Sequence, residues 1–203
     1  MKEAILAACL SYKGLTISGF DLPAILYATA VVESSLGANT TPRYEAHWDV
    51  GGSAFNKSKS QEWLRGLITR HGKFAVSSMG PFQVLYFRAA ELGYKGTPSG
   101  LEDPHAGALY AVADYRDKVR RFGDFKTLED AYDAYNTGNH RDANRPSAST
   151  FARFRSAYYE EFLKKNLPPM SGKGASSSGS LRCPSCSASL AWSLSVRSEG
   201  GGK

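Results

Sequence analysis

The sequence predicts a mainly α-helical fold, with one helical domain over residues 1–166 and a flexible tail over residues 167–203. Three observations support this prediction. Apolar residues recur at helical spacing through the first part of the chain, and no run alternates convincingly as a strand does. Helix start signals, an Asp or Thr and often a proline, precede several of these runs. After residue 167 the composition changes to Ser and Gly, which is typical of a flexible linker.

The first helix is expected over residues 2–12. It is short and amphipathic, with Cys9 on its apolar face as a buried thiol. A signal peptide is the less favoured alternative, because Glu3 sits in the charged end and the apolar run breaks at Ser11.

The second helix is expected over residues 22–34. Asp21 provides an N-cap and Pro23 stands just inside the helix, where its missing N–H costs nothing. Residues 38–60 follow and are rich in Gly, Asn, Thr and Ser, so we expect a long irregular loop there.

Five further helices are predicted from periodicity and caps, over residues 61–71, 81–92, 104–121, 128–135 and 147–165. Pro81 is expected to open the 81–92 helix and Gly93 to end it. In the last helix, Phe151, Phe154 and Tyr158 belong to an aromatic stripe that is expected to be core.

Length and charge narrow the class of protein. The chain has 203 residues, enough for one domain with a real core, and no stretch is apolar and long enough to cross a bilayer. The net charge is +6, and residues 167–203 hold four basic residues against one acidic residue. Such a tail suits an anionic polymer as partner, although a merely soluble surface would look the same. We expect a monomer.

The cysteines do not indicate a metal centre. Cys183 and Cys186 form a lone Cys-Pro-Ser-Cys in the tail, and a structural zinc site needs four ligands. The histidines lie far upstream. Only half a zinc ribbon completed by another chain would fit, so neither a metal nor a cofactor is expected.

The most informative residue is Glu33, which ends the second helix after a long uncharged run. A carboxyl group after such an apolar run either lies in solvent at the helix end, paired with an arginine, or is buried, with its pKa raised by desolvation. Two later segments, Ser77–Gln83 and Ala134–Gly138, favour the second interpretation.

Together with Glu33-Ser34, these segments resemble the lysozyme-like fold of soluble lytic transglycosylases, goose-type lysozymes and phage N-acetylmuramidases. The Glu-Ser pair ends the catalytic helix in those families, Gly80–Gln83 matches their Gly-x-x-Gln turn, and Ala134–Gly138 matches Ala-Tyr-Asn-x-Gly. Leu101–Pro104 looks like their Leu-x-Asp-Pro helix start. The resemblance covers roughly residues 20 to 140, and it implies that Glu33 is the proton donor.

The resemblance implies cleavage of the β-1,4 bond between N-acetylmuramic acid and N-acetylglucosamine in peptidoglycan. An inverting hydrolase needs a second carboxylate that holds a water, whereas a lytic transglycosylase needs none. Glu45 is the preferred candidate for that base and Asp49 the next, with a solvated loop acid as the alternative for either. Hydrolysis is favoured narrowly. Metal binding by Glu45 and His47 is disfavoured for want of a third ligand.

The resemblance also suggests which residues line the substrate cleft. Gly80 lets the backbone approach the sugar closely, and the Gln83 amide can bond an N-acetyl or hydroxyl group. Tyr135 and Asn136 resemble the family pair that reaches the substrate and the acid, whereas Tyr132 is expected to pack in the core. The substrate-binding set is therefore Ser34, Ser78, Met79, Gly80, Gln83, Tyr135 and Asn136.

The leading hypothesis is thus an endolysin-like muramidase that acts at the bacterial cell wall, with peptidoglycan as partner and anionic wall polymers as possible ligands of the tail. A catalytically inactive wall-binding module on the same scaffold is the rival from another class. Nucleic-acid binding is disfavoured, because the aromatic residues follow core spacing and are not interleaved with basic residues.

Overall fold

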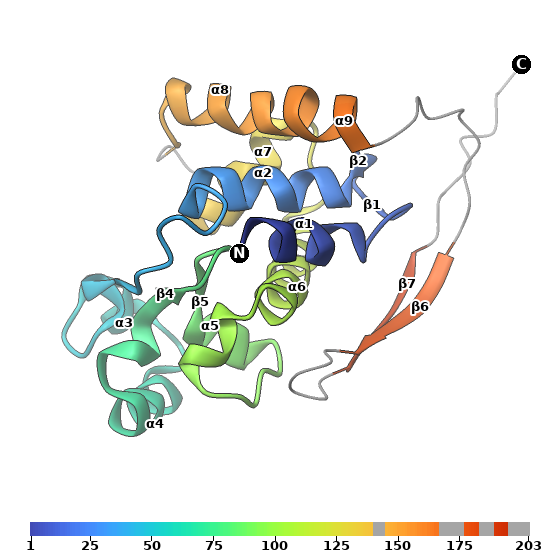
Figure 1. Ribbon diagram of the computed structural model, residues 1–203. Coiled ribbons are helices and arrows are strands. Elements are labelled where there is room, and N and C mark those ends of the chain that lie inside the picture. Colours follow the sequence, from blue (N-terminus) through green and yellow to red (C-terminus); the bar gives the residue numbers. More distant parts are fainter. Residues whose placement is uncertain (140–144, 167–176, 183–188, 195–203) are drawn as a thin grey trace, which may run out of the picture.

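Figure 1 shows the computed structural model, which is mainly helical. The structure describes residues 1–139 and 145–166, and the backbone of residues 177–182 and 189–194. The helices are α1 (Lys2–Leu10), α2 (Leu22–Ser34), α3 (Ser53–Lys57), α4 (Gln61–His71), α5 (Tyr86–Glu91), α6 (Pro104–Phe122), α7 (Leu128–Thr137), α8 (Ala148–Ser156) and α9 (Lys164–Asn166). Shorter 3-10 turns are η1 (Ala46–Trp48), η2 (Gly72–Val76) and η3 (Pro98–Glu102).

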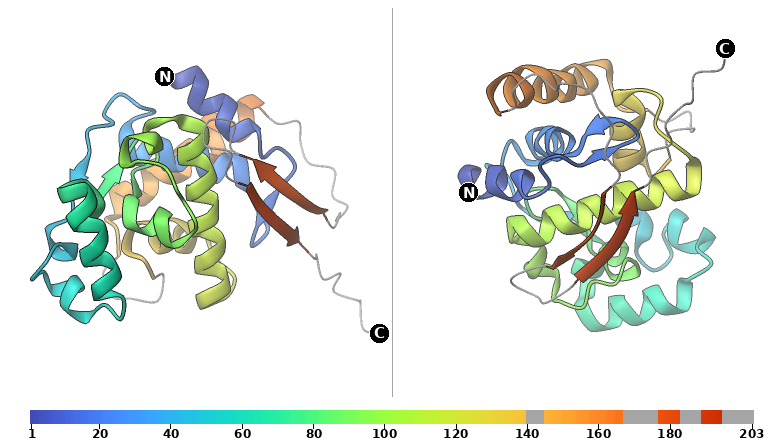
Figure 2. Two further views of the ribbon diagram at one scale, coloured as in Figure 1. Left: turned by 90° about the horizontal axis from the view of Figure 1, so that it is seen from below. Right: turned by 90° about the vertical axis from the view of Figure 1, so that its right-hand side faces the viewer.

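Helix α2 is the centre of the molecule, and nearly every residue from its start to Val31 is buried. The Asp21 side chain accepts from the Ala24 N–H at 2.9 Å, which confirms the expected cap. Helices α1, α6 and α8 all pack against α2. Figure 1 and the right-hand view of Figure 2 show α8 and α4 at opposite ends, with α2 and α6 between them. A helix buried on all sides needs apolar residues around its whole circumference, as this sequence has.

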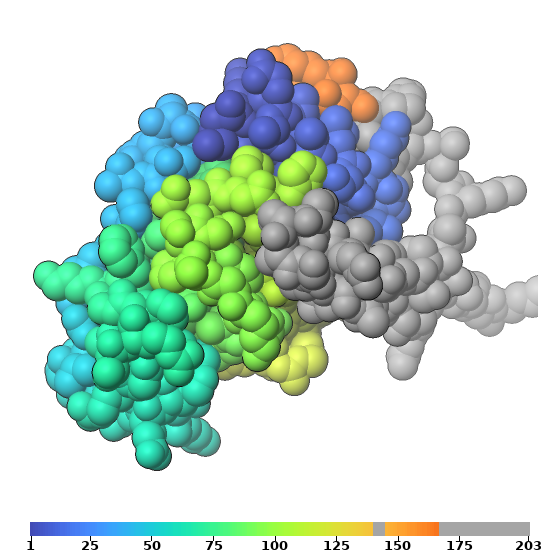
Figure 3. Space-filling model, turned by 60° about the horizontal axis from the view of Figure 1, so that its bottom comes forward, coloured from blue at the N-terminus to red at the C-terminus, as the bar shows by residue number. Residues whose placement is uncertain are grey.

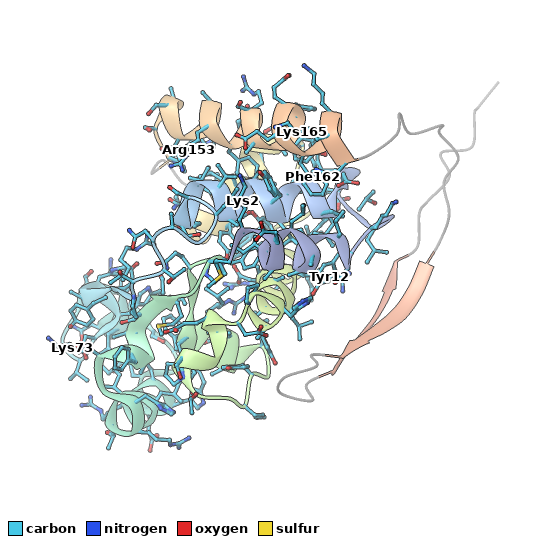
Figure 4. The ribbon with its side chains drawn as sticks, viewed as in Figure 1. Lys2, Tyr12, Lys73, Arg153, Phe162 and Lys165 are labelled. Carbon is cyan, nitrogen blue, oxygen red and sulfur yellow. The ribbon has the colours of Figure 1, made fainter. Side chains whose placement is uncertain are left out.

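Arg153 of α8 closes the C-terminal end of α2. Its guanidinium donates to the Val31 carbonyl at 2.6 Å and to the Ser35 hydroxyl at 2.9 Å. Figure 4 shows this side chain on the side of α8 that faces α2. A cation here adds a bond to a carbonyl of the last turn, which also accepts from the Ser35 N–H, and it opposes the negative end of the helix dipole.

Residues 43–85 form what we call the sheet lobe. It contains α3, α4 and an antiparallel sheet of β3 (Arg43–Tyr44), β4 (Ser77–Met79) and β5 (Val84–Leu85), with Arg43 opposite Ser78 and Met79 opposite Val84. A smaller hairpin pairs β1 (Thr16–Ile17) with β2 (Phe20–Asp21). The expected irregular loop over residues 38–60 therefore carries β3, η1 and α3. Such strands of two or three residues are too short to show an alternating pattern.

The predicted helix over residues 81–92 begins five residues late. Residues 80–83 form the tight turn between β4 and β5, with positive φ angles at Gly80 (71°) and Gln83 (47°), and α5 starts at Tyr86. Pro81 was a misleading signal, because proline suits a tight turn as well as the first turn of a helix.

The other predicted helices agree with the structure to within a few residues. Thr127 and Asp130 form a capping box at the start of α7. The segment 148–166 consists of α8, a π-helical stretch η4 (Ala157–Leu163) and α9. Of its aromatic stripe, Phe154, Tyr158 and Phe162 are buried, which confirms their assignment to the core.

In the tail, β6 (Ser177–Arg182) and β7 (Ser189–Leu194) pair as antiparallel strands, where the sequence predicted no regular structure. Leu190 and Trp192 alternate with Ala191 and Ser193, a pattern compatible with a strand. Cys183 and Cys186 lie outside the described residues. Cys9 is a free, buried cysteine, as expected. Within the described part of the chain, no helix meets the length and apolarity needed to cross a membrane.

Candidate active site

A cleft of about 900 Å³ separates the sheet lobe from the helices. The sheet lobe contributes Arg43, Glu45 and Trp63 to its lining, among others. The opposite wall comes from the end of α2, from α6 and from the last turn of α7. The cleft is large enough to take an extended ligand of several units.

Glu33 lies in the last turn of α2, and its carboxyl group lines this cleft. The side chain is only 5% exposed. Burial raises the pKa of Glu33 above its ordinary value, because the charged form loses hydration. Hydrogen bonds from Tyr132 and Asn136 and the charge of Arg43 lower the pKa in part without reversing the direction. The carboxyl group therefore keeps its proton to a higher pH than a free glutamate does.

The two hydrogen-bond partners of Glu33 come from one face of α7. Tyr132 donates its hydroxyl to Oε1 of Glu33 at 2.9 Å, and Asn136 follows one turn later on the same face. The Tyr132 ring is stacked on Phe154, with centroids 4.7 Å apart. Tyr132 is buried in the core, as expected, but its bond to the acid was not predicted. Its four-residue spacing from Asn136 was the signal that could have revealed it.

Tyr135 lines the cleft, but its hydroxyl does not reach the acid. It donates to the Phe82 carbonyl at 2.7 Å, and its ring stacks on Tyr115 at 4.8 Å. Tyr135 therefore ties α7 to the turn between β4 and β5. Of the predicted pair Tyr135 and Asn136, only Asn136 bonds the carboxyl group.

A single arginine links two carboxyl groups in the cleft. Arg43 places Nη1 3.7 Å from Oε2 of Glu33 and Nε 2.7 Å from Oε1 of Glu45. Glu45 also accepts from the Ser78 hydroxyl at 3.4 Å, and its side chain is 21% exposed. The structure thus brings the two predicted acids, Glu33 and Glu45, into one site together with Ser78.

Asp49 is not part of that arrangement. Its carboxylate accepts from the Tyr44 hydroxyl and from the Val50 N–H at 2.7 Å, so it stabilises the local turn. Asp49 is not among the residues that line the cleft. The second candidate for the water-holding base therefore lies outside the cleft, because the Asp49 carboxylate is bonded by Tyr44 and Val50.

The turn between β4 and β5 is held by close packing. A Cβ added to Gly80 would lie 2.1 Å from the Leu101 carbonyl oxygen, so only glycine fits there. The Gln83 side chain lines the cleft, and its amide donates to the Gly80 carbonyl at 2.9 Å. This bond holds the Gln83 side chain in one position, from which its amide can also bond a ligand in the cleft.

Three residues of the predicted substrate-binding set, Ser34, Met79 and Gly80, are buried and are not among the residues that line the cleft. Met79 is 1% exposed and belongs to the core. The Ser34 hydroxyl donates to the Pro81 carbonyl at 2.7 Å and accepts from the Gly37 N–H at 2.9 Å. These bonds fasten the end of α2 to the turn, so Ser34 positions Glu33 and does not face a ligand.

The end of the cleft formed by α6 contains charged residues that the sequence analysis did not single out. Arg88 contacts Asp114 at 2.8 Å, and Lys118 lies 3.7 Å from the same Asp114 oxygen. Burial lowers the pKa of Lys118, and the charge of Asp114 offsets part of that effect. These groups balance one another, so this end of the cleft is polar without a large excess of charge.

Among the described residues, no cluster of three or more His, Cys, Asp or Glu side chains is placed to hold a metal ion. What the site offers is a shielded proton donor, a second carboxylate and an arginine between them. This combination can perform general acid catalysis, in which a carboxyl group of raised pKa gives its proton to a leaving group.

In comparisons with known proteins, no family model, no curated protein and no solved structure matches this chain. A functional assignment therefore depends on the geometry of the cleft and on the motifs that build it.

Proposed function

We propose that this protein is a lysozyme-like enzyme that cleaves the glycan strands of peptidoglycan at the β-1,4 bond between N-acetylmuramic acid and N-acetylglucosamine. Glu33 acts as the general acid. The bacterial cell wall is the place of action, with peptidoglycan as the partner. The observation that carries the proposal is the shielded Glu33 carboxyl group, which lines a long cleft and accepts a hydrogen bond from Tyr132.

The surroundings of Glu33 suit both stages of proton transfer. Before reaction, burial favours the protonated form of the carboxyl group, which is the form that can donate to the glycosidic oxygen. After reaction, the carboxylate that remains is stabilised by the hydroxyl of Tyr132, the amide of Asn136 and the charge of Arg43. The leaving sugar thus departs as a neutral alcohol, and Glu33 must regain a proton before the next turnover.

Glu45 is the candidate for activating the water on the other side of the sugar. Inverting hydrolases separate the two carboxyl groups by about 6.5–9.5 Å, which leaves room for a water. Here one guanidinium contacts both carboxyl groups, so Glu33 and Glu45 are close neighbours without touching. We therefore favour hydrolysis with a reducing end as product.

A lytic transglycosylase is the second candidate, and one contact favours it. Glu45 is already bonded by Arg43 at 2.7 Å, which occupies an oxygen that a water-holding base would need. In a transglycosylase the muramic acid C6 hydroxyl attacks in place of water, and a 1,6-anhydro end results. No second acid is then required.

Product analysis decides between these functions. Purified sacculi are digested, and the fragments are identified by mass spectrometry, with Glu33→Gln as the inactive control. Reducing ends support the hydrolase and anhydro ends the transglycosylase. Binding to sacculi without any release of fragments would point to an inactive wall-binding module, and full activity of Glu33→Gln would refute the assigned acid.

A further inference from the structure

A second pocket, of about 270 Å³, lies between α4, α5 and the segment 94–97. Figure 3 shows the face on which α4, in teal, meets the segment after α5, in light green. The pocket is smaller than the roughly 300–1,000 Å³ of sites for drug-sized ligands, so its natural ligand is a small group such as one branch of a larger molecule.

The walls of this pocket are aromatic and rigid. Tyr86 and Tyr94 are buried and meet edge to face, with centroids 6.1 Å apart. The Tyr86 hydroxyl lies 3.1 Å from Nε2 of His71 and donates to the Gly96 carbonyl at 3.2 Å. These bonds tie the segment after α5 to the end of α4 and hold the pocket open.

The rim of the pocket is positively charged. Arg70 and Lys95 line it, and no Asp or Glu among the described residues does. No ion pair joins either cation to another described side chain, in contrast to the balanced charges of the main cleft. The charge of Arg70 reaches the pocket interior, since it acts on the Tyr86 hydroxyl. Two cations without a neutralising acid favour an anionic ligand.

The pocket adjoins the main cleft through one residue. Trp63 of α4 lines both, and it is 40% exposed. A ligand that lies in the cleft can therefore pass a branch over the indole and into the pocket. An exposed indole provides a stacking surface for such a branch without closing the passage.

We propose that this pocket is a second binding site, which takes a carboxylate-bearing branch of the polymer whose backbone occupies the cleft. Arg70 and Lys95 bind the carboxylate, and Trp63, Tyr86 and Tyr94 contact its apolar part. The inference rests on the proposed function, because peptidoglycan strands carry such branches. Two sources provide this chemistry: the stem peptide of intact strands, and the lactyl carboxylate of a muramic acid that carries no peptide.

The test compares three substrates that differ in their carboxylates. Chito-oligosaccharides carry none, strands treated with an amidase carry the lactyl carboxylate alone, and intact strands carry the stem peptide. The double variant Arg70→Gln/Lys95→Gln is compared with Lys13→Gln/Lys126→Gln, which removes the same charge at exposed positions that line neither cavity.

We expect Arg70→Gln/Lys95→Gln to raise KM about tenfold on intact strands, with kcat unchanged, because two partly exposed ion pairs are lost. Neither double variant should change KM on chito-oligosaccharides. A rise confined to amidase-treated strands, in which the lactyl carboxyl group is freed from its amide bond, would identify the lactyl carboxylate as the ligand. If the control variant weakens binding equally, or if Arg70→Gln/Lys95→Gln has the KM of the wild type on every strand, the pocket is not the site.

A direct binding measurement separates this inference from the proposed function. The free stem peptide is titrated into the wild type, and the Trp63 indole N–H is followed by NMR after assignment with Trp63→Phe. A shift that disappears in Arg70→Gln/Lys95→Gln supports the pocket even if no strand is cleaved. If neither the free stem peptide nor N-acetylmuramic acid moves the Trp63 signal of a wild type that cleaves strands, the pocket alone is overturned.

Discussion

The Tyr132 hydroxyl donates to Oε1 of Glu33 at 2.9 Å, across 99 positions of sequence. This bond joins α2, the helix that contributes the acid, to α7, which belongs to the same wall of the cleft. It stabilises the charged form of the carboxyl group, whereas burial stabilises the neutral form, and burial is the larger effect. The pKa of Glu33 is thus set by two opposing contributions that can be changed separately.

The first prediction concerns Tyr132→Phe. Loss of the hydroxyl removes a contribution that lowers the pKa of Glu33, so the pKa rises further. A general acid works only while protonated, and activity falls as the pH passes its pKa. The alkaline limb of the pH–activity profile should therefore move to higher pH, with a lower maximal rate. Tyr27→Phe, which loses a hydroxyl at 3.3 Å from Glu161, is the control and should leave the profile unchanged.

The second prediction concerns stability and pH in Glu33→Gln. Because burial raises the pKa of Glu33 in the folded state, folding is favoured while the group is protonated, and this contribution is lost as the pH rises through the folded pKa. The variant should therefore melt above the wild type at pH 8, and the difference should disappear at pH 4. In a chain of this size each 1 kcal/mol corresponds to about 2–4 °C of Tm.

Thermal melts across this pH range provide the measurement, and the exposed Glu3→Gln provides the control. A Glu33→Gln variant that melts below the wild type at pH 8 would show that ion pairing with Arg43 outweighs burial.

The third prediction tests the second carboxylate. If Glu45 activates a water, Glu45→Gln should lower the rate by about 10²–10⁴-fold while KM changes little. Asp49→Asn should stay within about twofold of the wild type, because Asp49 only bonds its own turn. Initial rates on sacculi give the comparison. Equal rates for Glu45→Gln and wild type would exclude Glu45 as the base and favour the transglycosylase.

The fourth prediction concerns the turn that faces Glu33. Gly80→Ala places a methyl group 2.1 Å from the Leu101 carbonyl oxygen, at a φ of 71°. The positive φ alone costs an alanine about 1–2 kcal/mol. Because the contact adds to that cost, the variant should lose more than about 2 kcal/mol of unfolding free energy. Gly19→Ala has a φ of 83° with no atom within 4 Å, so it should cost only the conformational part, about 1–2 kcal/mol. Urea unfolding of both variants measures the difference. Equal losses of unfolding free energy would mean that the structure relaxes around the contact with Leu101 without losing stability.

Much of the fold could be predicted from local signals. Asp21 and Pro23 marked the start of α2, and Thr127 marked the start of α7, because caps act on backbone groups within the same turn. The turn at residues 80–83 could not be predicted. Its positive φ angles depend on Leu101 and on pairing with β4, and neither contact is visible in the neighbouring sequence.

The residues of the candidate site were also predicted only in part. Glu33, Glu45, Ser78, Gln83 and Asn136 meet at one cleft as expected, whereas four other predicted residues do not line it: Ser34, Asp49, Met79 and Gly80. Whether Tyr132 or Tyr135 bonds Glu33 depends on how α7 is rotated about its axis, which only the structure shows. Both tyrosines lie on a helix with a broad buried face, so periodicity alone does not show which one points at Glu33.

By itself, the sequence determined most of the segments that become helices, and that one carboxyl group ends the most apolar of them. Only the tertiary structure decided what surrounds that carboxyl group: Tyr132 and Arg43 as partners, Ser34 as an anchor and a charged second pocket beyond Trp63. Local propensity acts over a few residues, whereas a pKa and a cleft depend on groups that packing brings together from distant parts of the chain.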